Sequence, residues 1–381
     1  MANRKYKVCH VLSKFDVGGM ENGVVNICND LNRSLFVPSI LCVKDTGPMI
    51  SRIKPDIKVH NMGYSEGRYL SRFLFVAKYF MKEKPDVVHT HGWGACSFDG
   101  IMGAKLAGVP VVVNGEHGAT FNRPYQIFIQ RMLSYLCDAT LSVSESLKKR
   151  IVTEIGMDPG KVTVIDNGVN TNLFNGEADT GPLKKELREK NRISFSDTTM
   201  FISSIGSLKP LKNQIFLLKA VKRLYEKYAD AEVDVVFVGE GPDREMLERY
   251  SAEAGIKEYV AFLGRRDDIP AILSFADALV LTSIPDKEGM SNVILEAMSS
   301  GVPVISTPSI GTSELIADGK NGYIVDYNDT DDLCDRIYAM FKDKSARNEM
   351  SREARSLIKR KYSLDKMVWT YEKMYLRFFE K

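Results

Sequence analysis

Two glutamates eight positions apart, Glu288 and Glu296, are the residues of this chain whose type and spacing most suggest chemistry. Carboxylates accept hydrogen bonds from sugar hydroxyls, and phosphate groups bind where backbone amides at the start of a helix point at them. A carboxylate on either side of such an amide site indicates a polyol that flanks a phosphate. A nucleotide sugar has this layout: ribose, diphosphate and hexose in a row. The alternative is that Glu288 is a solvated loop charge and Glu296 is a surface residue of a helix.

The elements around the two glutamates bear on this choice. The short apolar runs 278–282 and 302–307 are typical of strands buried on both faces, and a helix is predicted between them over 291–301. If both glutamates were helical, eight residues at ~100° each would set them roughly 80° apart. With Glu288 in the loop before the helix, both side chains can face one ligand that lies across the helix N-terminus.

The run EGMSNVILEAMSSGVPVIST, which begins at Glu288, resembles the E-x7-E segment of the retaining glycosyltransferases of family four. The spacing of the two glutamates fits, and so does the trailing EAM-x-x-G-x-PV. The resemblance implies that Glu296 holds the donor ribose, that Glu288 holds the donor hexose in a catalytic role, and that the intervening backbone binds the diphosphate. The donor-binding residues of this loop are then Gly289, Met290, Ser291 and Asn292.

The length of 381 residues predicts two domains. A polar, charged boundary region covers residues 175–200. The resemblance implies an α/β protein of the GT-B class, in which two Rossmann-like, doubly wound parallel-sheet domains face each other across a cleft. We expect an acceptor domain over 1–178, a nucleotide-sugar donor domain over 179–362, and a C-terminal helix over 363–381 that returns to the first domain.

A double glycine, Gly18-Gly19, precedes a helical pattern near the start of the chain. Its spacing does not fit G-x-G-x-x-G, so the dinucleotide-oxidoreductase fingerprint is absent. By itself a double glycine is a turn, whereas the resemblance implies a loop near the donor diphosphate. The surrounding run FDVGGMENGVVN further resembles sugar transferases of exosortase-linked exopolysaccharide clusters.

Histidines follow two of the predicted strands. The run 85–93 predicts a strand that carries His89 and His91 on one face. An H-x-H pair can bind a metal, but the spacing supplies no third ligand. His117 follows another strand, where open α/β sheets bind ligands, although a lone loop histidine is the alternative. The resemblance implies a catalytic position for His117 near the transferred sugar, and it makes His91 and Trp93 candidates for acceptor binding.

The second half opens with a strand and the loop GSLKPLKN, where the family usually reads G-R-L-x-x-x-K-x. Gly206 and Lys212 match this pattern, which implies contacts with the donor phosphates. Ser207 replaces the arginine, so a point charge remains and the bidentate fork is missing. Three other basic residues could replace the missing charge: Lys209, Arg265 and Arg266.

Composition excludes several other classes of protein. A net charge of +3 is too small for the basic patch of a nucleic-acid-binding protein. The six cysteines have no C-x-x-C or paired spacing, which favours reduced thiols in the cytoplasm over disulfides or zinc. The apolar run near the N-terminus is too short for a signal peptide, and no run approaches the ~20 apolar residues of a membrane span.

The run 68–84 predicts a helix in which aromatic and aliphatic residues alternate with lysine and arginine. Such a helix could lie on an anionic membrane surface. The alternative is a helix that packs on the sheet and leaves its lysines in water. We therefore expect a cytoplasmic protein, with peripheral contact to the inner membrane surface as one option.

Taken together, these features predict a retaining, metal-independent glycosyltransferase that moves a hexose from a nucleotide-diphosphate sugar to a glycan or lipid-linked oligosaccharide. The setting would be cell-surface or exopolysaccharide synthesis. No cofactor is expected, and a UDP-sugar is favoured over a GDP-sugar as donor. The alternatives are a nucleotide-sugar epimerase of the same architecture, which needs no acceptor, and a non-catalytic sugar-binding protein.

Overall fold

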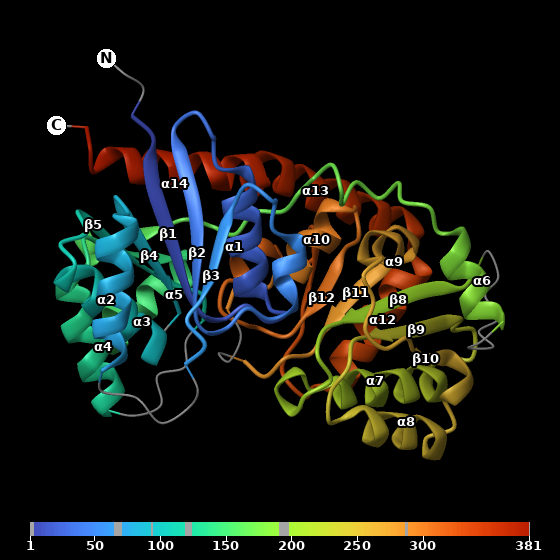
Figure 1. Cartoon of the computed structure of the whole chain (residues 1–381). Helices are drawn as coiled ribbons and strands as arrows, with labels where there is room; N and C mark the ends of the chain where they lie inside the picture. The colour runs from blue at the N-terminus through green and yellow to red at the C-terminus, as the bar shows by residue number, and fades with distance from the viewer. Residues whose placement is uncertain are drawn as a thin grey trace. The chain divides into compact units, whose positions relative to one another are not determined.

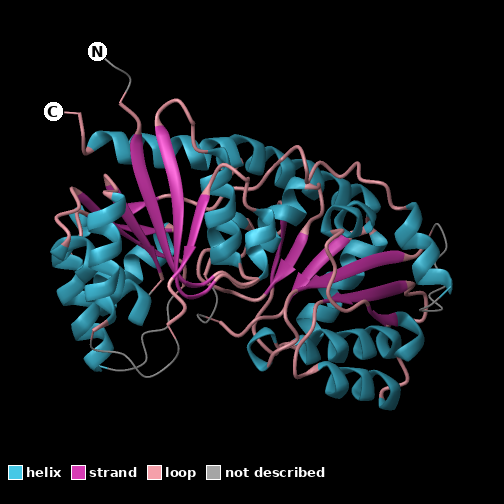
Figure 2. Cartoon of the chain, in the orientation of Figure 1, coloured by secondary structure: helices cyan, strands magenta, loops and turns pink. Residues whose placement is uncertain are grey.

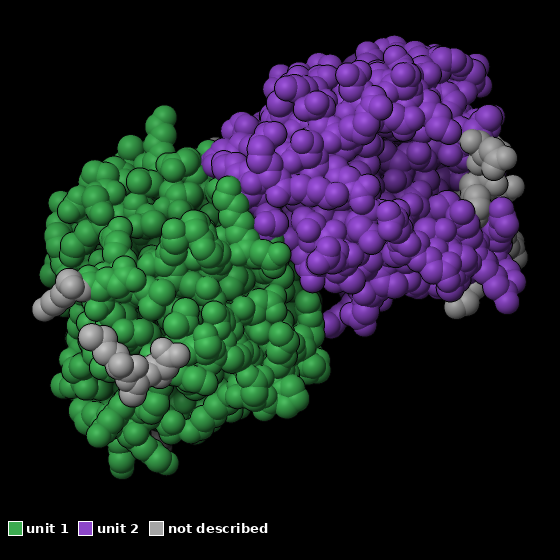
Figure 3. Space-filling view, turned by 90° about the horizontal axis from the view of Figure 1, so that it is seen from above, with its two compact units in different colours: residues 1–168, 364–381 green, residues 169–363 purple. Residues whose placement is uncertain are grey.

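The computed structural model (Figure 1) describes residues 4–64, 71–92, 94–118, 124–189, 198–285 and 289–380. Strands and helices alternate along most of the chain (Figure 2). The chain divides into two compact units, of which unit 1 comprises residues 1–168 and 364–381 and unit 2 comprises residues 169–363 (Figure 3). Glu288 and Trp93 lie outside the described residues, so their roles stay predictions.

Unit 1 is built on a seven-stranded parallel sheet in the order β3-β2-β1-β4-β5-β6-β7. Its strands are β1 (Tyr6–Lys14), β2 (Phe36–Asp45), β3 (Lys58–Asn61), β4 (Val87–His91), β5 (Val111–Glu116), β6 (Ala139–Ser142) and β7 (Val162–Val164). The central strands β4 and β5 are buried along their whole length, as expected for strands covered on both faces. The chain starts in the middle of the sheet and winds outward in both directions, which confirms the predicted doubly wound class.

Helices cover both faces of this sheet. They are α1 (Gly19–Asp30), α2 (Arg72–Glu83), α3 (Ala95–Leu106), α4 (Pro124–Leu136), α5 (Glu145–Arg150) and α14 (Leu364–Arg377). Val76 and Phe80 of α2 share an apolar cluster with Val88 of β4, whereas Ile27 of α1 and Tyr371 of α14 share the cluster that contains Val8 of β1. Neighbouring residues of a strand point to opposite faces, so these two clusters lie on opposite sides of the sheet.

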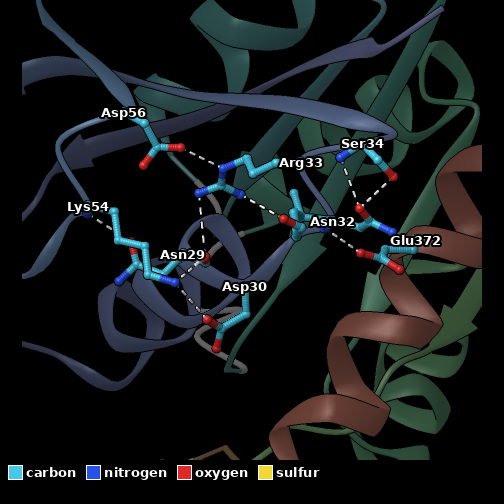
Figure 4. Close-up of polar contacts among 9 residues, drawn as sticks. Asn29, Asp30, Asn32, Arg33, Ser34, Lys54, Asp56 and Glu372 are labelled. Atoms are coloured by element: carbon cyan, nitrogen blue, oxygen red, sulfur yellow. Dashed lines mark hydrogen bonds and ion pairs between the residues drawn. The ribbon is translucent and has the colours of Figure 1, made fainter. Parts of the chain in front are cut away.

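Helix α14, dark red in Figure 1, completes the core of unit 1 from the far end of the chain. Its buried residues recur at steps of three and four, the pattern of a helix with one apolar face: Leu364, Met367, Val368, Tyr371, Met374 and Tyr375. Glu372 accepts a hydrogen bond from the backbone N–H of Asn32 at 2.6 Å, close to the Arg33–Asp56 ion pair (Figure 4). The side of the sheet that carries Val8 is therefore sealed by a segment distant in sequence.

Unit 2 repeats the same design with a six-stranded parallel sheet in the order β10-β9-β8-β11-β12-β13. Its strands are β8 (Met200–Ile205), β9 (Val233–Val238), β10 (Val260–Phe262), β11 (Ala278–Leu281), β12 (Val304–Ser306) and β13 (Gly322–Ile324). Its helices are α6 (Gly181–Glu189), α7 (Gln214–Lys227), α8 (Arg244–Glu253), α9 (Ile269–Phe275), α10 (Asn292–Ser299), α11 (Thr312–Leu315), α12 (Thr330–Lys342) and α13 (Lys344–Lys361). In the part of the chain that the structure describes, no helix is long and apolar enough to cross a bilayer.

Each sheet has one point where the strand order reverses: between β1 and β4 in unit 1, and between β8 and β11 in unit 2. Loops diverge there at the C-terminal ends of the strands, and open α/β sheets bind ligands in the crevice that this leaves. Most of the predicted site residues follow these four strands. In unit 1 they are Gly18 and Gly19, and His91 is the last residue of β4; in unit 2 they are Gly206, Lys212, Gly289, Met290, Ser291, Asn292 and Glu296.

Candidate active site

In unit 2, the loops after β8 and β11 are held together at the switch point. Thr282 Oγ1 lies 3.0 Å from the carbonyl oxygen of Lys212 and 2.9 Å from that of Asn213, and it donates to this pair. Lys212 is half-buried, and its Nζ lies 3.9 Å from where a Cβ atom of Gly206 would stand. The structure therefore brings together Gly206 and Lys212, two of the predicted donor-binding residues.

The turn after β9 packs against this loop. The close approach explains why the turn contains two glycines, Gly239 and Gly241. A Cβ atom on Gly239 would lie 2.0 Å from the carbonyl oxygen of Gly206. A Cβ atom on Gly241 would lie 2.0 Å from the carbonyl oxygen of Leu208. Because a backbone oxygen cannot move aside as a flexible side chain can, only glycine allows the two turns to approach so closely.

The three basic residues proposed as substitutes for the missing arginine differ in their surroundings. Arg266 forms ion pairs with Glu186 and Asp268, both at 2.7 Å. These two carboxylates hold its guanidinium in place, which argues against a role on a phosphate. Lys209 and Arg265 are exposed, so either remains a candidate for the missing charge.

Helix α10 begins where the sequence predicts, with Ser291 as its N-cap. Within the described residues, the Ser291 side chain makes no capping hydrogen bond to the first turn. A helix N-terminus favours an anion through its backbone N–H groups and its dipole. Glu296 is half-buried and lies one turn after Asn292 on the same side of the helix, whereas Leu295 is fully buried. Two further predicted donor-binding residues directly precede this segment: Gly289 and Met290.

In unit 1, the loop after β1 leads directly into α1. Gly18 is the N-cap with extended backbone (φ −164°, ψ 167°), and Gly19 is the first helical residue. Glu21 lies in the first turn, and burial, followed by the nearby charge of Asp16, raises the pKa of its carboxyl. The double glycine thus opens a helix at the switch point of its sheet, as the sequence pattern predicts; its place near the donor diphosphate stays a prediction.

Four histidines gather on one face of the unit 1 sheet. The strand register places His10 of β1 beside His89 of β4, and His91 of β4 beside Gly115 of β5. His10 Nδ1 lies 2.8 Å from His91 Nε2, and His91 Nδ1 lies 3.0 Å from His117 Nε2. The rings of His89 and His91 are 4.1 Å apart between centroids. His117, which directly follows β5, is the half-buried member of the group.

The placement of His91 argues against direct contact with an acceptor. Its side chain is 1% exposed, and both of its ring nitrogens are hydrogen-bonded to other histidines. One nitrogen from each of His10, His89 and His91 lies within 4.8 Å of the others, the spacing of a possible metal triad. Both nitrogens of His91, however, are engaged by His10 and His117. The group fits a hydrogen-bonded chain of imidazoles better than a metal centre.

Sequence reasoning missed His10 and a second polar chain on the opposite face of the sheet. Thr90 Oγ1 donates to Asn114 Oδ1, and Asn114 Nδ2 donates to Glu116 Oε1, both at 2.7 Å. Burial raises the pKa of the Glu116 carboxyl well above its usual value. Alternation along each strand is visible in the sequence, but which residues become neighbours depends on the register between strands.

Acidification is expected to destabilise unit 1 below about pH 6.5. Burial lowers the pKa of His10 to about 3 and the pKa values of His89 and His91 well below 6.5. Between the lowered pKa of each folded ring and pH 6.5, the unfolded chain binds a proton that the folded chain does not. The free energy of unfolding therefore falls by about 1.4 kcal/mol for each ring and each unit by which the pH is lowered. Glu116 and Asp99 oppose this trend, because burial raises their pKa values and the folded state retains their protons.

Urea unfolding between pH 7.5 and pH 5 checks this expectation. In the His10→Phe variant, the free energy of unfolding should fall less steeply on acidification. Its slope against pH should be smaller by the contribution of one ring, about 1.4 kcal/mol per pH unit. The matched control is His60→Phe, because His60 lies outside the cluster and stacks on Tyr79. Equal slopes for wild type and His10→Phe would contradict the expectation.

Two family models match the chain, one for each half. The model described as Glycosyltransferase Family 4 covers residues 17–173, and the model described as Glycosyl transferases group 1 covers residues 185–357. Together the two matches span most of the chain, and the second contains both strands of the unit 2 switch point, β8 and β11.

Curated relatives match along nearly the whole length. The chain is 29% identical over 388 residues to UDP-Gal:alpha-D-GlcNAc-diphosphoundecaprenol alpha-1,3-galactosyltransferase of Escherichia coli, covering 98% of this chain and 97% of the relative. It is 24% identical over 339 residues to N-acetyl-alpha-D-glucosaminyl L-malate synthase of Bacillus anthracis, covering 86% and 85%.

Solved structures share the fold. A glycosyltransferase from Rickettsia africae superposes with a TM-score of 0.86 at 18% identity, covering 99% of both chains. HepE of Anabaena in complex with UDP superposes with a TM-score of 0.80 at 18% identity, covering 97% of this chain and 99% of that one. At such identities the likeness shows the fold alone, and that fold is the GT-B architecture of two parallel-sheet domains. The chain therefore belongs to glycosyltransferase family 4, the glycosyl transferases group 1.

Proposed function

We propose that this glycosyltransferase is retaining and metal-independent, and that it moves a hexose from a UDP-sugar to a lipid-linked or other glycan in exopolysaccharide or related cell-surface synthesis. The observation that carries the proposal is the arrangement at the switch point of unit 2. There α10 begins directly after the loop that follows β11, Lys212 lies beside Gly206, and Glu296 follows one turn into the helix.

The names of similar proteins support the choice of donor and acceptor. The Escherichia coli relative is named for UDP-Gal and for a diphosphoundecaprenol acceptor. HepE has been crystallised with UDP and with UDP-glucose. A uridine nucleotide and a lipid-linked diphosphate acceptor are therefore the first substrates to test.

The proposed chemistry depends on charge at the leaving group. When the sugar–phosphate bond breaks, negative charge grows on the departing diphosphate. Lys212 and the amides at the start of α10 would stabilise this charge in the way a metal ion does in other transferases. The amides of Gly18 and Gly19 are a further proposed group for the diphosphate.

The remaining residues divide between the two ends of the donor. We assign Glu296 to the ribose hydroxyls and Glu288 to the donor hexose, and His117 to a catalytic position near the transferred sugar. Retention would follow from attack on the same face that the phosphate leaves. A double displacement would instead need a carboxylate nucleophile close to the anomeric carbon.

An apolar stripe on α4 supports peripheral contact with a membrane. Tyr125, Phe128, Ile129, Met132 and Tyr135 recur at steps of three and four and are 43–65% exposed. A helix whose outward face is apolar needs a partner, and an interfacial lipid layer suits a face of this composition. The predicted candidate, α2, also exposes apolar residues but packs its other face on the sheet.

The double substitution Phe128→Asp with Met132→Asp is expected to weaken binding to anionic phosphatidylglycerol vesicles by about tenfold or more, because two apolar side chains would no longer enter the lipid. Vesicle sedimentation measures this. The control is Leu173→Asp, which replaces an apolar side chain of similar exposure (51%) in unit 2. Unchanged sedimentation of the double variant would rule out α4 as the contact.

A thermal-shift screen with UDP-, GDP- and ADP-sugars tests the donor proposal. UDP-sugars should raise the melting temperature most, since a ligand that binds only the folded state stabilises it. If no nucleotide raises the melting temperature, the result favours the alternative, a non-catalytic sugar-binding protein. Chromatography of a UDP-sugar incubated without acceptor separates the transferase from an epimerase, because an epimerase would convert the sugar under these conditions.

A further inference from the structure

Three histidines of unit 1 are connected end to end through their ring nitrogens. His10 Nδ1 lies 2.8 Å from His91 Nε2, and His91 Nδ1 lies 3.0 Å from His117 Nε2. The chain of rings starts at His10, which is fully buried, and ends at His117, which is half-buried at the end of β5. His10 Nε2 has no hydrogen-bond partner among the residues that the structure describes.

The sheet is shaped to hold these rings. A Cβ atom on Gly115 would lie 2.8 Å from His89 Nε2 and 3.5 Å from His91 Nδ1, so any side chain at this position would push the imidazoles apart. The ring of His89 lies against that of His91 at a tilt of 30° and is itself anchored by a 2.7 Å hydrogen bond between its Nδ1 and the hydroxyl of Tyr375. The cluster therefore has a fixed geometry on strands and on α14, not a chance approach of surface rings.

The number of ring protons limits the combinations of tautomers that the three linked histidines can adopt. A neutral imidazole carries one N–H and one bare nitrogen, so it can donate at one end and accept at the other. If His91 donates to His117, it must accept from His10; if it donates to His10, it must accept from His117. Burial lowers the pKa values of all three rings, to about 3 for His10 and about 4 for His117, so the neutral state applies at neutral pH.

We infer that His10, His91 and His117 share one tautomer and change it together, so that His10 and His91 act as positioning residues for His117. In one state all three rings carry the proton on Nδ1, and the far nitrogen of His117 donates a hydrogen bond. In the other state all three carry it on Nε2, and the same nitrogen accepts.

The consequence for catalysis rests on the proposed function. The tautomer of the three rings would decide whether His117 donates a hydrogen bond to the sugar or accepts one from it. A ligand oxygen that accepts a hydrogen bond from His117 selects the first state, and a sugar hydroxyl that donates to it selects the second. The choice is transmitted to His10, which is fully buried. Replacing His10 should then change how well His117 binds each kind of group.

Nitrogen NMR of the full chain labelled with ¹⁵N-histidine tests the inference directly. The chain has five histidines, and long-range proton–nitrogen correlations distinguish a protonated ring nitrogen from a bare one. At pH 7.5, in the free protein and with UDP-galactose added, His10, His91 and His117 should carry the proton on the same-named nitrogen. A wild-type spectrum in which these three rings differ in tautomer overturns the inference, whether or not the protein transfers sugar.

Variants separate coupling from simple packing. His91→Phe keeps an aromatic ring but removes both hydrogen bonds, so His117 should lose its fixed tautomer and show averaged nitrogen shifts. His60→Phe is the matched control and should leave the three rings unchanged, because His60 stacks on Tyr79 outside the chain. If His117 keeps its wild-type tautomer in His91→Phe, the coupling is absent. If that variant does not fold, His10→Phe serves in its place: it keeps the hydrogen bond between His91 and His117, so these two rings should still share one tautomer, and a mismatch would show that the coupling is absent.

Discussion

Alanine in place of Glu296 is expected to weaken UDP binding by about 10- to 100-fold, the loss of hydrogen bonds to a charged acceptor. Alanine in place of Glu288 is expected to leave UDP affinity within about twofold and to lower turnover by about 10²- to 10³-fold. These two results would give the two glutamates separate roles, at opposite ends of one donor.

The reason for the separation is the chemistry of the ligand that each assay uses. UDP contains the ribose but lacks the hexose, so it reports on Glu296 and not on Glu288. Glu296 is half-buried on the second turn of α10, where a carboxylate is partly shielded from water and its hydrogen bonds gain strength. A group on the hexose affects the transition state, in which the sugar develops positive charge.

Calorimetric titration of UDP and steady-state turnover measure the two effects. Glu245→Ala is the matched control, because Glu245 is an exposed glutamate in the first turn of another unit 2 helix. It should change neither quantity. Equal loss of UDP affinity in Glu288→Ala and Glu296→Ala would contradict the division of roles.

Methionine in place of Lys212 is expected to lower turnover by about 10²- to 10³-fold, and to weaken UDP binding much less. The leaving diphosphate carries more negative charge in the transition state than in the bound donor, so the ammonium group contributes most to turnover. Ser207 stands where family members usually have an arginine, and Arg266 is held by Glu186 and Asp268. Lys212 should therefore matter more here than in relatives with both cations.

Turnover and UDP affinity of three variants give the test. Lys212→Arg should recover part of the activity, because it restores a cation near Gly206. Lys209→Met removes an exposed lysine of the same loop and should have little effect. Equal losses for Lys212→Met and Lys209→Met would show that the loop supplies only a diffuse positive field.

Local signals made the α10 segment predictable. An apolar run that ends at a loop, an N-cap residue and a glycine stop are features of a few neighbouring residues, and α10 starts at Asn292 as they indicate. A similar pattern placed Gly18 before α1, whereas Gly206 and Lys212 were identified only by the resemblance to the family's loop. The doubly wound order of both sheets also follows from alternating strands and helices, because parallel strands need crossover connections.

Properties that depend on register could not be predicted in this way. His10 became part of the site only because β1 lies beside β4 with His10 opposite His89. His91 was expected to face an acceptor, but its position on β4 turns its ring toward His10 and His117 in the interior. A strand reveals which residues share a face, and not which partner strand supplies their neighbours.

The most direct measurement of the central claim is the stereochemistry of transfer without divalent metal. UDP-galactose and UDP-glucose would be incubated with a synthetic lipid-linked GlcNAc diphosphate in the presence of EDTA, and the anomeric proton of the new linkage would be read by NMR. The account predicts an α-linked product, matching the α-configured donor, with a yield that EDTA does not change. A β-linked product, or activity that EDTA abolishes and a divalent cation restores, would contradict it.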